Sequence, residues 1–154
     1  MMKTFRRLPI YSIVFIFCVI NQIAAVNGYA AELNIPASRG TRGEVVKLPV
    51  TVDKVENLAG IKLSLTYNKE ILKFIKAEKT AFTANMLYVV NDKTPGKLII
   101  SMAAARGFTA EKAPLVEMSF ELLRDINKED NPILWISAAE LMSDRLQRIE
   151  LKFH

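Results

Sequence analysis

The chain has 154 residues, a net charge of +5, one cysteine and one histidine. It therefore has room for one domain, since a domain usually takes about 100–200 residues. Three positive charges, on Lys3, Arg6 and Arg7, lie at the front, and without them the net charge falls from +5 to +2. The remaining basic residues alternate with acidic ones and form no basic stripe, so no nucleic-acid partner is expected.

The front of the chain has the layout of an export signal. Basic residues precede an apolar run over residues 8–20, and small and polar residues follow up to Ala30. We therefore predict a signal peptide over residues 1–30 and one domain over residues 31–154. An uncleaved membrane anchor over residues 8–26 is the competing interpretation, but Asn21 and Gln22 interrupt that stretch, and its uninterrupted part is short for a span. The protein is expected to be exported, periplasmic or extracellular, without a membrane attachment after cleavage.

Cysteine and histidine chemistry is not expected in the mature domain. Cys18 lies within the apolar run and lacks the small residue that precedes a lipoprotein cysteine. After cleavage no cysteine remains, which excludes disulfides, thiolate catalysis and sulfur-bound metals. His154 is the last residue, and chain ends are usually poorly ordered. A histidine-based triad or metal site is therefore not expected.

The carboxylates offer no better case for catalysis. On one strand Glu117 and Glu121 would lie about 13 Å apart, too far for acid and base to cooperate. The sequence contains no EF-hand calcium loop and no glycine-rich phosphate loop. We expect neither an enzyme nor a bound cofactor or metal.

From residue 44 onward the sequence is typical of an all-β protein, with short aliphatic and β-branched blocks separated by turn residues. Residues 44–52 form the first block. Residues 61–67 alternate most cleanly, with Lys62, Ser64 and Thr66 on one face and apolar side chains on the other. The apolar face of this strand is expected in the core and its polar face in solvent.

The rest of the chain continues the pattern. The polar residues 91–96, with Pro95 and Gly96, predict a hairpin connection, and a helical turn stays open for residues 82–85. A charged loop is expected over residues 124–131. Further strands are predicted over residues 72–77, 86–90, 98–102, 116–122, 133–138 and 147–153. Together these blocks predict a two-sheet β-sandwich of eight or nine strands.

Several segments in order resemble cohesin domains. The run Asn-Leu-Ala-Gly-Ile-Lys-Leu-Ser-Leu-Thr-Tyr-Asn over residues 57–68 is similar to the third-strand signature of that family. Residues 43–52 resemble its opening G-x-x-V-x-x-P-V strand, with Pro49 in register, and the similarity continues through residues 96–103 and 137–141. The resemblance implies a nine-stranded jelly-roll sandwich. It also implies that one sheet face binds a dockerin, a small calcium-loaded helical module of another exported protein, with the calcium on the partner.

The partner-binding face follows from the same resemblance. Its outward positions would be Gly60, Lys62, Ser64, Thr66, Ile99, Ser101, Ala103, Glu117 and Ser119. Lys62 stands where the family often carries an acidic residue or asparagine, which is a departure from the family pattern. The leading hypothesis is a protein-interaction module that uses this face.

A carbohydrate-binding module is the alternative, because related sandwiches stack sugar rings on exposed aromatic side chains. The candidates are Trp135, Tyr88 and Phe108, which would need to form an exposed row to bind polysaccharide. The pattern around Trp135 leaves its direction open, since both faces of that strand are apolar. The resemblance implies that Trp135 points inward.

Overall fold

The computed structural model describes residues 30–152. Apart from Ala30, the predicted signal peptide lies outside the described residues, as do Phe153 and His154. Within the described residues no helix has the length and apolar character to cross a membrane. The elements are β1 (Ala31–Asn34), β2 (Val45–Tyr67), β3 (Leu72–Lys79), β4 (Leu87–Asn91), β5 (Lys97–Leu122), the 3-10 helix η1 (Lys128–Asp130), β6 (Leu134–Ser143), β7 (Arg148–Ile149) and β8 (Leu151–Lys152).

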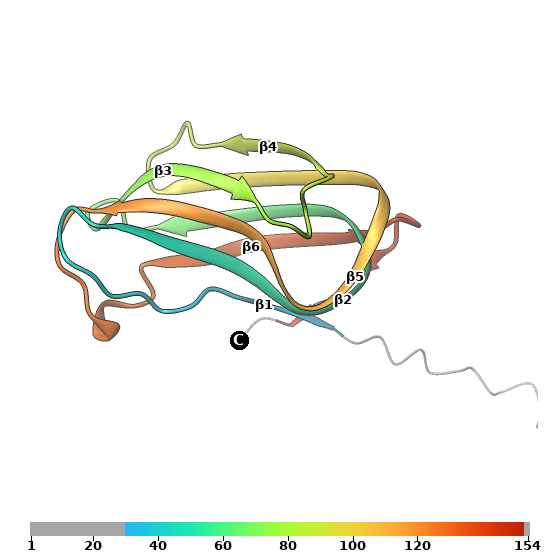
Figure 1. The fold of residues 1–154 in the computed structure, drawn as a ribbon, viewed down its shortest axis with the longest axis horizontal. Coiled ribbons are helices and arrows are strands. Elements are labelled where there is room, and N and C mark those ends of the chain that lie inside the picture. Colours follow the sequence, from blue (N-terminus) through green and yellow to red (C-terminus); the bar gives the residue numbers. More distant parts are fainter. Residues whose placement is uncertain (1–29, 153–154) are drawn as a thin grey trace, which may run out of the picture.

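The strands β2 and β5 are long, and each belongs to two layers of the fold. Residues 45–55 of β2 pair with residues 110–121 of β5, whereas residues 60–66 pair with residues 97–103. Figure 1 shows both strands curving at one end of the molecule and returning in the other layer. The sequence predicted two strands where each of these continuous strands is found. That boundary prediction is wrong, because the ladder persists around the bend.

Local backbone features explain why the ladder bends without ending. The pairing of β2 with β5 shifts register between Val55 and Leu58 and again between Leu58 and Gly60. Such irregularities increase twist and bend a strand. Asn57 has a φ of 53°, in the left-handed region that asparagine tolerates better than most residues. A Cβ atom at Gly107 would lie 2.2 Å from the Asn57 carbonyl oxygen, so glycine is required where the two backbones meet.

The bends divide the structure into two layers. The first layer contains β3, the second half of β5, the first half of β2, and then β1 and β8. The second layer contains β4, the first half of β5, the second half of β2, and then β6 and β7. The all-β two-sheet sandwich is confirmed. The prediction omitted β1, and the segment expected over residues 147–153 forms the two short strands β7 and β8.

The core lies between the layers. Tyr67 of the second layer meets Phe120 of the first with ring centroids 5.2 Å apart, and Phe74 of β3 lies 5.6 Å from the same Phe120 ring. Leu63 and Leu65 are buried as their alternation predicted. Burying one large aliphatic side chain contributes about 1.5–3 kcal/mol. The expected core face of residues 61–67 is therefore confirmed.

We predict that Gly107→Ala lowers the free energy of unfolding by about 1–3 kcal/mol, because the added methyl group must displace the Asn57 backbone. Denaturant unfolding would measure the change. Ala105→Ser, at an exposed position near the bend, is the control and should shift the midpoint little. Equal stability of Gly107→Ala and the parent would contradict the close approach of the two backbones.

Candidate functional site

The outer face of the first layer carries ion pairs between lysines and glutamates. Lys47 pairs with Glu117 at 2.7 Å, and Lys73 pairs with Glu121 at 3.1 Å. A third pair, on β3, joins Lys76 to Glu78 at 2.9 Å. Exposed pairs of this kind contribute little to stability and stay hydrated. This face is therefore suited to solvent.

Two residues predicted for the partner-binding face belong to this first layer. Glu117 forms the ion pair with Lys47, and Ser119 is 3% exposed between its neighbours Lys47 and Lys76. Grouping them with Ile99, Ser101 and Ala103 was wrong. The physical reason is the bend in β5, which carries the two halves of the strand into different layers.

The other predicted positions do lie together, on the outer face of the second layer. Lys62 is directly beside Ser101, and Ser64 is directly beside Ile99. We call this surface the second-layer face. It comprises Leu87 and Val89 of β4, Ile99, Ser101 and Ala103 of β5, Gly60, Lys62, Ser64 and Thr66 of β2, and Trp135, Ala138 and Glu140 of β6.

Large apolar side chains are exposed on this face. Leu87 is 78% exposed and Val89 66%, while Ile99 and Trp135 are each 41% exposed. Leu87 and Val89 were not singled out from the sequence. In β4 both alternating sets are apolar, so no polar set marked the outward direction. The first layer also has exposed apolar side chains, Val45 at 56% and Ile75 at 46%, but there they accompany three lysine–glutamate ion pairs.

Trp135 points outward, contrary to the expectation drawn from the family resemblance. Ser64 pairs with Ala138 while the next residue, Leu65, pairs with Ile136, so Ser137 is an extra residue in β6. An insertion of one residue reverses the direction of the side chains that precede it along the strand. The Ser137 hydroxyl donates a hydrogen bond of 2.9 Å to the Ser64 carbonyl oxygen at this bulge. Trp135 is consequently on the outer face, beside Thr66.

The aromatic row required for the carbohydrate hypothesis is not formed. Tyr88 of β4 donates its hydroxyl to the Ala77 carbonyl oxygen of β3, across the two layers. Burial, and to a smaller extent the nearby charge of Glu78, raise the pKa of Tyr88 above its usual value. Phe108 lies against Phe82 with ring centroids 5.9 Å apart. Of the three aromatics, Trp135 belongs to the second-layer face.

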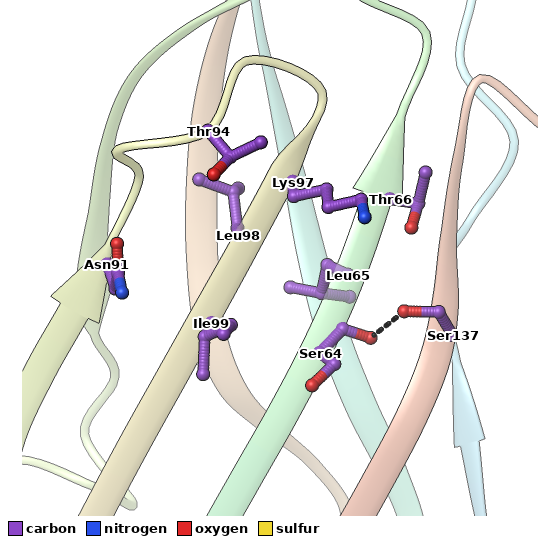
Figure 2. A pocket seen from close by; sticks show the side chains of 9 residues that line it. All are labelled: Ser64, Leu65, Thr66, Asn91, Thr94, Lys97, Leu98, Ile99 and Ser137. Carbon is purple, nitrogen blue, oxygen red and sulfur yellow. Dashed lines mark hydrogen bonds between the residues drawn. The ribbon is translucent and has the colours of Figure 1, made fainter.

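A hollow of about 350 Å³ lies at one end of the second-layer face. Figure 2 shows it between the turn that follows β4 and the ends of three neighbouring strands, with Lys97 lying across toward Thr66. Its lining is Ser64, Leu65, Thr66, Asn91, Thr94, Lys97, Leu98, Ile99 and Ser137.

Within residues 30–152, no cluster of three or more histidine, cysteine, aspartate or glutamate side chains is placed to bind a metal ion. The second-layer face is the candidate binding site, because it combines exposed large apolar side chains with a hollow at one end.

Comparison with known proteins identifies the family. The cohesin domain model matches residues 31–153, and the chain belongs to the cohesin domain family. This confirms the resemblance recognised in the sequence. Comparison with the curated proteins finds no match.

Solved cohesins share the fold. A non-cellulosomal cohesin from the archaeon Archaeoglobus fulgidus has a TM-score of 0.68 at 14% identity, over 79% of this chain and 84% of that one. The sixth cohesin of scaffoldin B from Acetivibrio cellulolyticus, solved in complex with a dockerin, has a TM-score of 0.65 at 17% identity, over 80% and 93%. A type I cohesin–dockerin complex from Clostridium thermocellum gives 0.63 at 15% identity, over 80% and 88%.

We predict that Tyr88→Phe lowers the free energy of unfolding at neutral pH by about 1 kcal/mol, because the hydrogen bond between the layers is lost. The pKa of Tyr88 is raised in the folded chain, so its contribution is complete below the unfolded-state pKa and declines as the pH rises through the folded-state pKa. Denaturant unfolding at neutral and strongly alkaline pH measures this. A difference between parent and variant that stays constant with pH would contradict the assignment.

Proposed function

We propose that this chain is an exported, non-enzymatic module that docks a partner protein through the second-layer face, and that the partner is a dockerin-type module of another exported protein. The observation that carries the proposal is the difference between the two outer faces. The first layer carries three lysine–glutamate ion pairs beside the exposed Val45, whereas the second-layer face exposes Leu87, Val89, Ile99 and Trp135.

The energetics favour docking on the second-layer face. Covering the first layer would remove the paired lysines and glutamates from water, at a desolvation cost that ion pairs often fail to offset. Covering the second layer removes apolar surface from water, which contributes about 25 cal/mol per Å² before the costs of association. Trp135 adds to this, because tryptophan is one of the residue types that contribute most to the binding energy of protein interfaces.

The shape of the face suits a helix. Its flanks carry bulky side chains, Leu87 and Val89 on β4 and Trp135 on β6. The two middle strands carry small residues such as Gly60 and Ser101, together with the longer Lys62 and Ile99. Four adjacent strands span about 14 Å at the usual spacing. A helix with its side chains is about 10–12 Å wide, so one helix fits between the flanks.

The comparisons support a protein partner, because two of the similar solved cohesins are in complex with dockerins. Export is supported by the signal-like sequence at the front of the chain. These are the grounds for naming an exported dockerin as the partner.

Polysaccharide binding is the second candidate, and one observation favours it: the exposed indole of Trp135. The hydrogen bond of Tyr88 across the layers leaves Trp135 without an aromatic neighbour on this face among the three candidates. Loss of retention on insoluble polysaccharide in Trp135→Ala, with unchanged capture of protein, would favour this candidate over docking.

We predict that Val89→Asp reduces partner capture at least about tenfold, a loss of roughly 1.4 kcal/mol or more, because a carboxylate would be buried under the docked helix. The chain is used to recover partners from envelope and secreted fractions of the source organism, with calcium and again with chelator. Recovery that needs calcium is expected for a dockerin. Recovery that is indifferent to calcium would keep a protein partner and contradict a dockerin.

The matched control is Val45→Asp, the same change at a 56% exposed valine of the first layer. It should leave capture unchanged. Loss of capture in Val45→Asp but not in Val89→Asp would place the interface on the first layer and overturn the proposal.

A further inference from the structure

The charged side chain that lines the hollow at the end of the second-layer face is positive. Of the lining residues, Lys97 is charged and none is acidic. None of the ion pairs in the described part of the chain includes Lys97. Three lysines on the outer face of the first layer, Lys47, Lys73 and Lys76, are each paired with a glutamate.

Hydrogen-bond donors line the hollow together with this lysine. Thr66 and Ser64 of β2 and Thr94 of the turn present hydroxyl groups to the hollow. The side-chain oxygen of Asn91 accepts a hydrogen bond of 3.2 Å from the Lys93 backbone, which leaves the amide NH₂ group free to donate. An ammonium group with several neutral donors is suited to an anion, because charge-assisted hydrogen bonds are about twice as strong as neutral ones.

The other charges on the face do not neutralise the hollow. Glu140 lies on β6 directly opposite Lys62, which is a second cation of the same face. Neither Lys62 nor Glu140 lines the hollow. Asp92, in the turn, is also outside the lining. Lys97 therefore meets an incoming partner without a carboxylate beside it.

Docking would remove the Lys97 ammonium group from water, which is unfavourable unless the partner supplies an anion. Removing a charge from water without a partner is strongly unfavourable, and an opposite charge with good geometry offsets that penalty. Ile99, which is 41% exposed, gives the hollow an apolar wall. An acidic side chain fits this combination, since its methylene groups can lie on the isoleucine while its carboxylate meets the ammonium.

We propose that the hollow receives an aspartate or glutamate side chain from a helix of the docked partner, with Lys97 as the residue that selects for it. The inference rests on the docking role proposed above and specifies the chemistry of the partner: an amphipathic helix with an apolar stripe and a carboxylate at one end.

A helix library tests this even before the natural partner is identified. A yeast-displayed two-helix scaffold with randomised exposed positions is selected for binding to the full chain. Binders of the second-layer face are recognised by loss of binding to Val89→Asp and retention on Val45→Asp. Their affinities are then measured for the parent, for Lys97→Gln and for the control Lys93→Gln, a lysine of the same turn that does not line the hollow.

The expected result is that face binders carry an aspartate or glutamate whose change to the amide weakens binding about tenfold. Lys97→Gln should cause a similar loss, the two losses should not add, and Lys93→Gln should have little effect. Unchanged circular dichroism and unfolding midpoint of Lys97→Gln exclude a folding defect.

The experiment distinguishes failure of the carboxylate site from failure of the docking role. Face binders that tolerate Lys97→Gln and need no acidic residue would overturn the carboxylate site while leaving the docking role intact. An absence of binders, or binders that are insensitive to Val89→Asp, would contradict the docking role itself.

Discussion

The bend shared by β2 and β5 is the constraint on which the rest of the structure depends. Both strands run through both layers, so each contributes one half to the charged face and the other half to the apolar face. The two bends pack directly against each other where Gly107 of β5 contacts the Asn57 backbone of β2. Because the ladder between the strands continues around the bend, the layers are held at a fixed separation and close over a single apolar core.

The functional difference between the faces follows from this division. The first layer brings the outward lysines Lys47 and Lys73 within ion-pair distance of glutamates on β5, which produces a hydrated, charged surface. The second layer places Leu87, Val89 and Trp135 on its flanking strands β4 and β6, and it places small residues together with Lys62 and Ile99 on its middle strands. The bulge at Ser137 completes that arrangement, because without it Trp135 would point into the core. A hydrogen bond from Tyr88 then joins the edge of the second layer to β3.

Alternation in the sequence predicted the sandwich and most of the candidate face. The clean alternation of residues 61–67 identified Lys62, Ser64 and Thr66 as outward, and the structure places their β5 neighbours beside them. Alternation carries no information on which layer a strand segment joins, and Glu117 and Ser119 were therefore assigned to the wrong layer. It also fails where both sides of a strand are apolar, as in β4, and where a bulge shifts the phase, as before Ala138. These features depend on pairing between distant segments, which a local pattern does not encode.

The most direct test of the account is to map the footprint of the captured partner by backbone amide hydrogen exchange, with and without the partner bound. Docking on the second-layer face should increase protection in residues 58–66, 97–103 and 134–142, with no change in residues 45–52 and 113–121. Protection confined to the second of these sets would contradict the assignment of the second-layer face as the docking site.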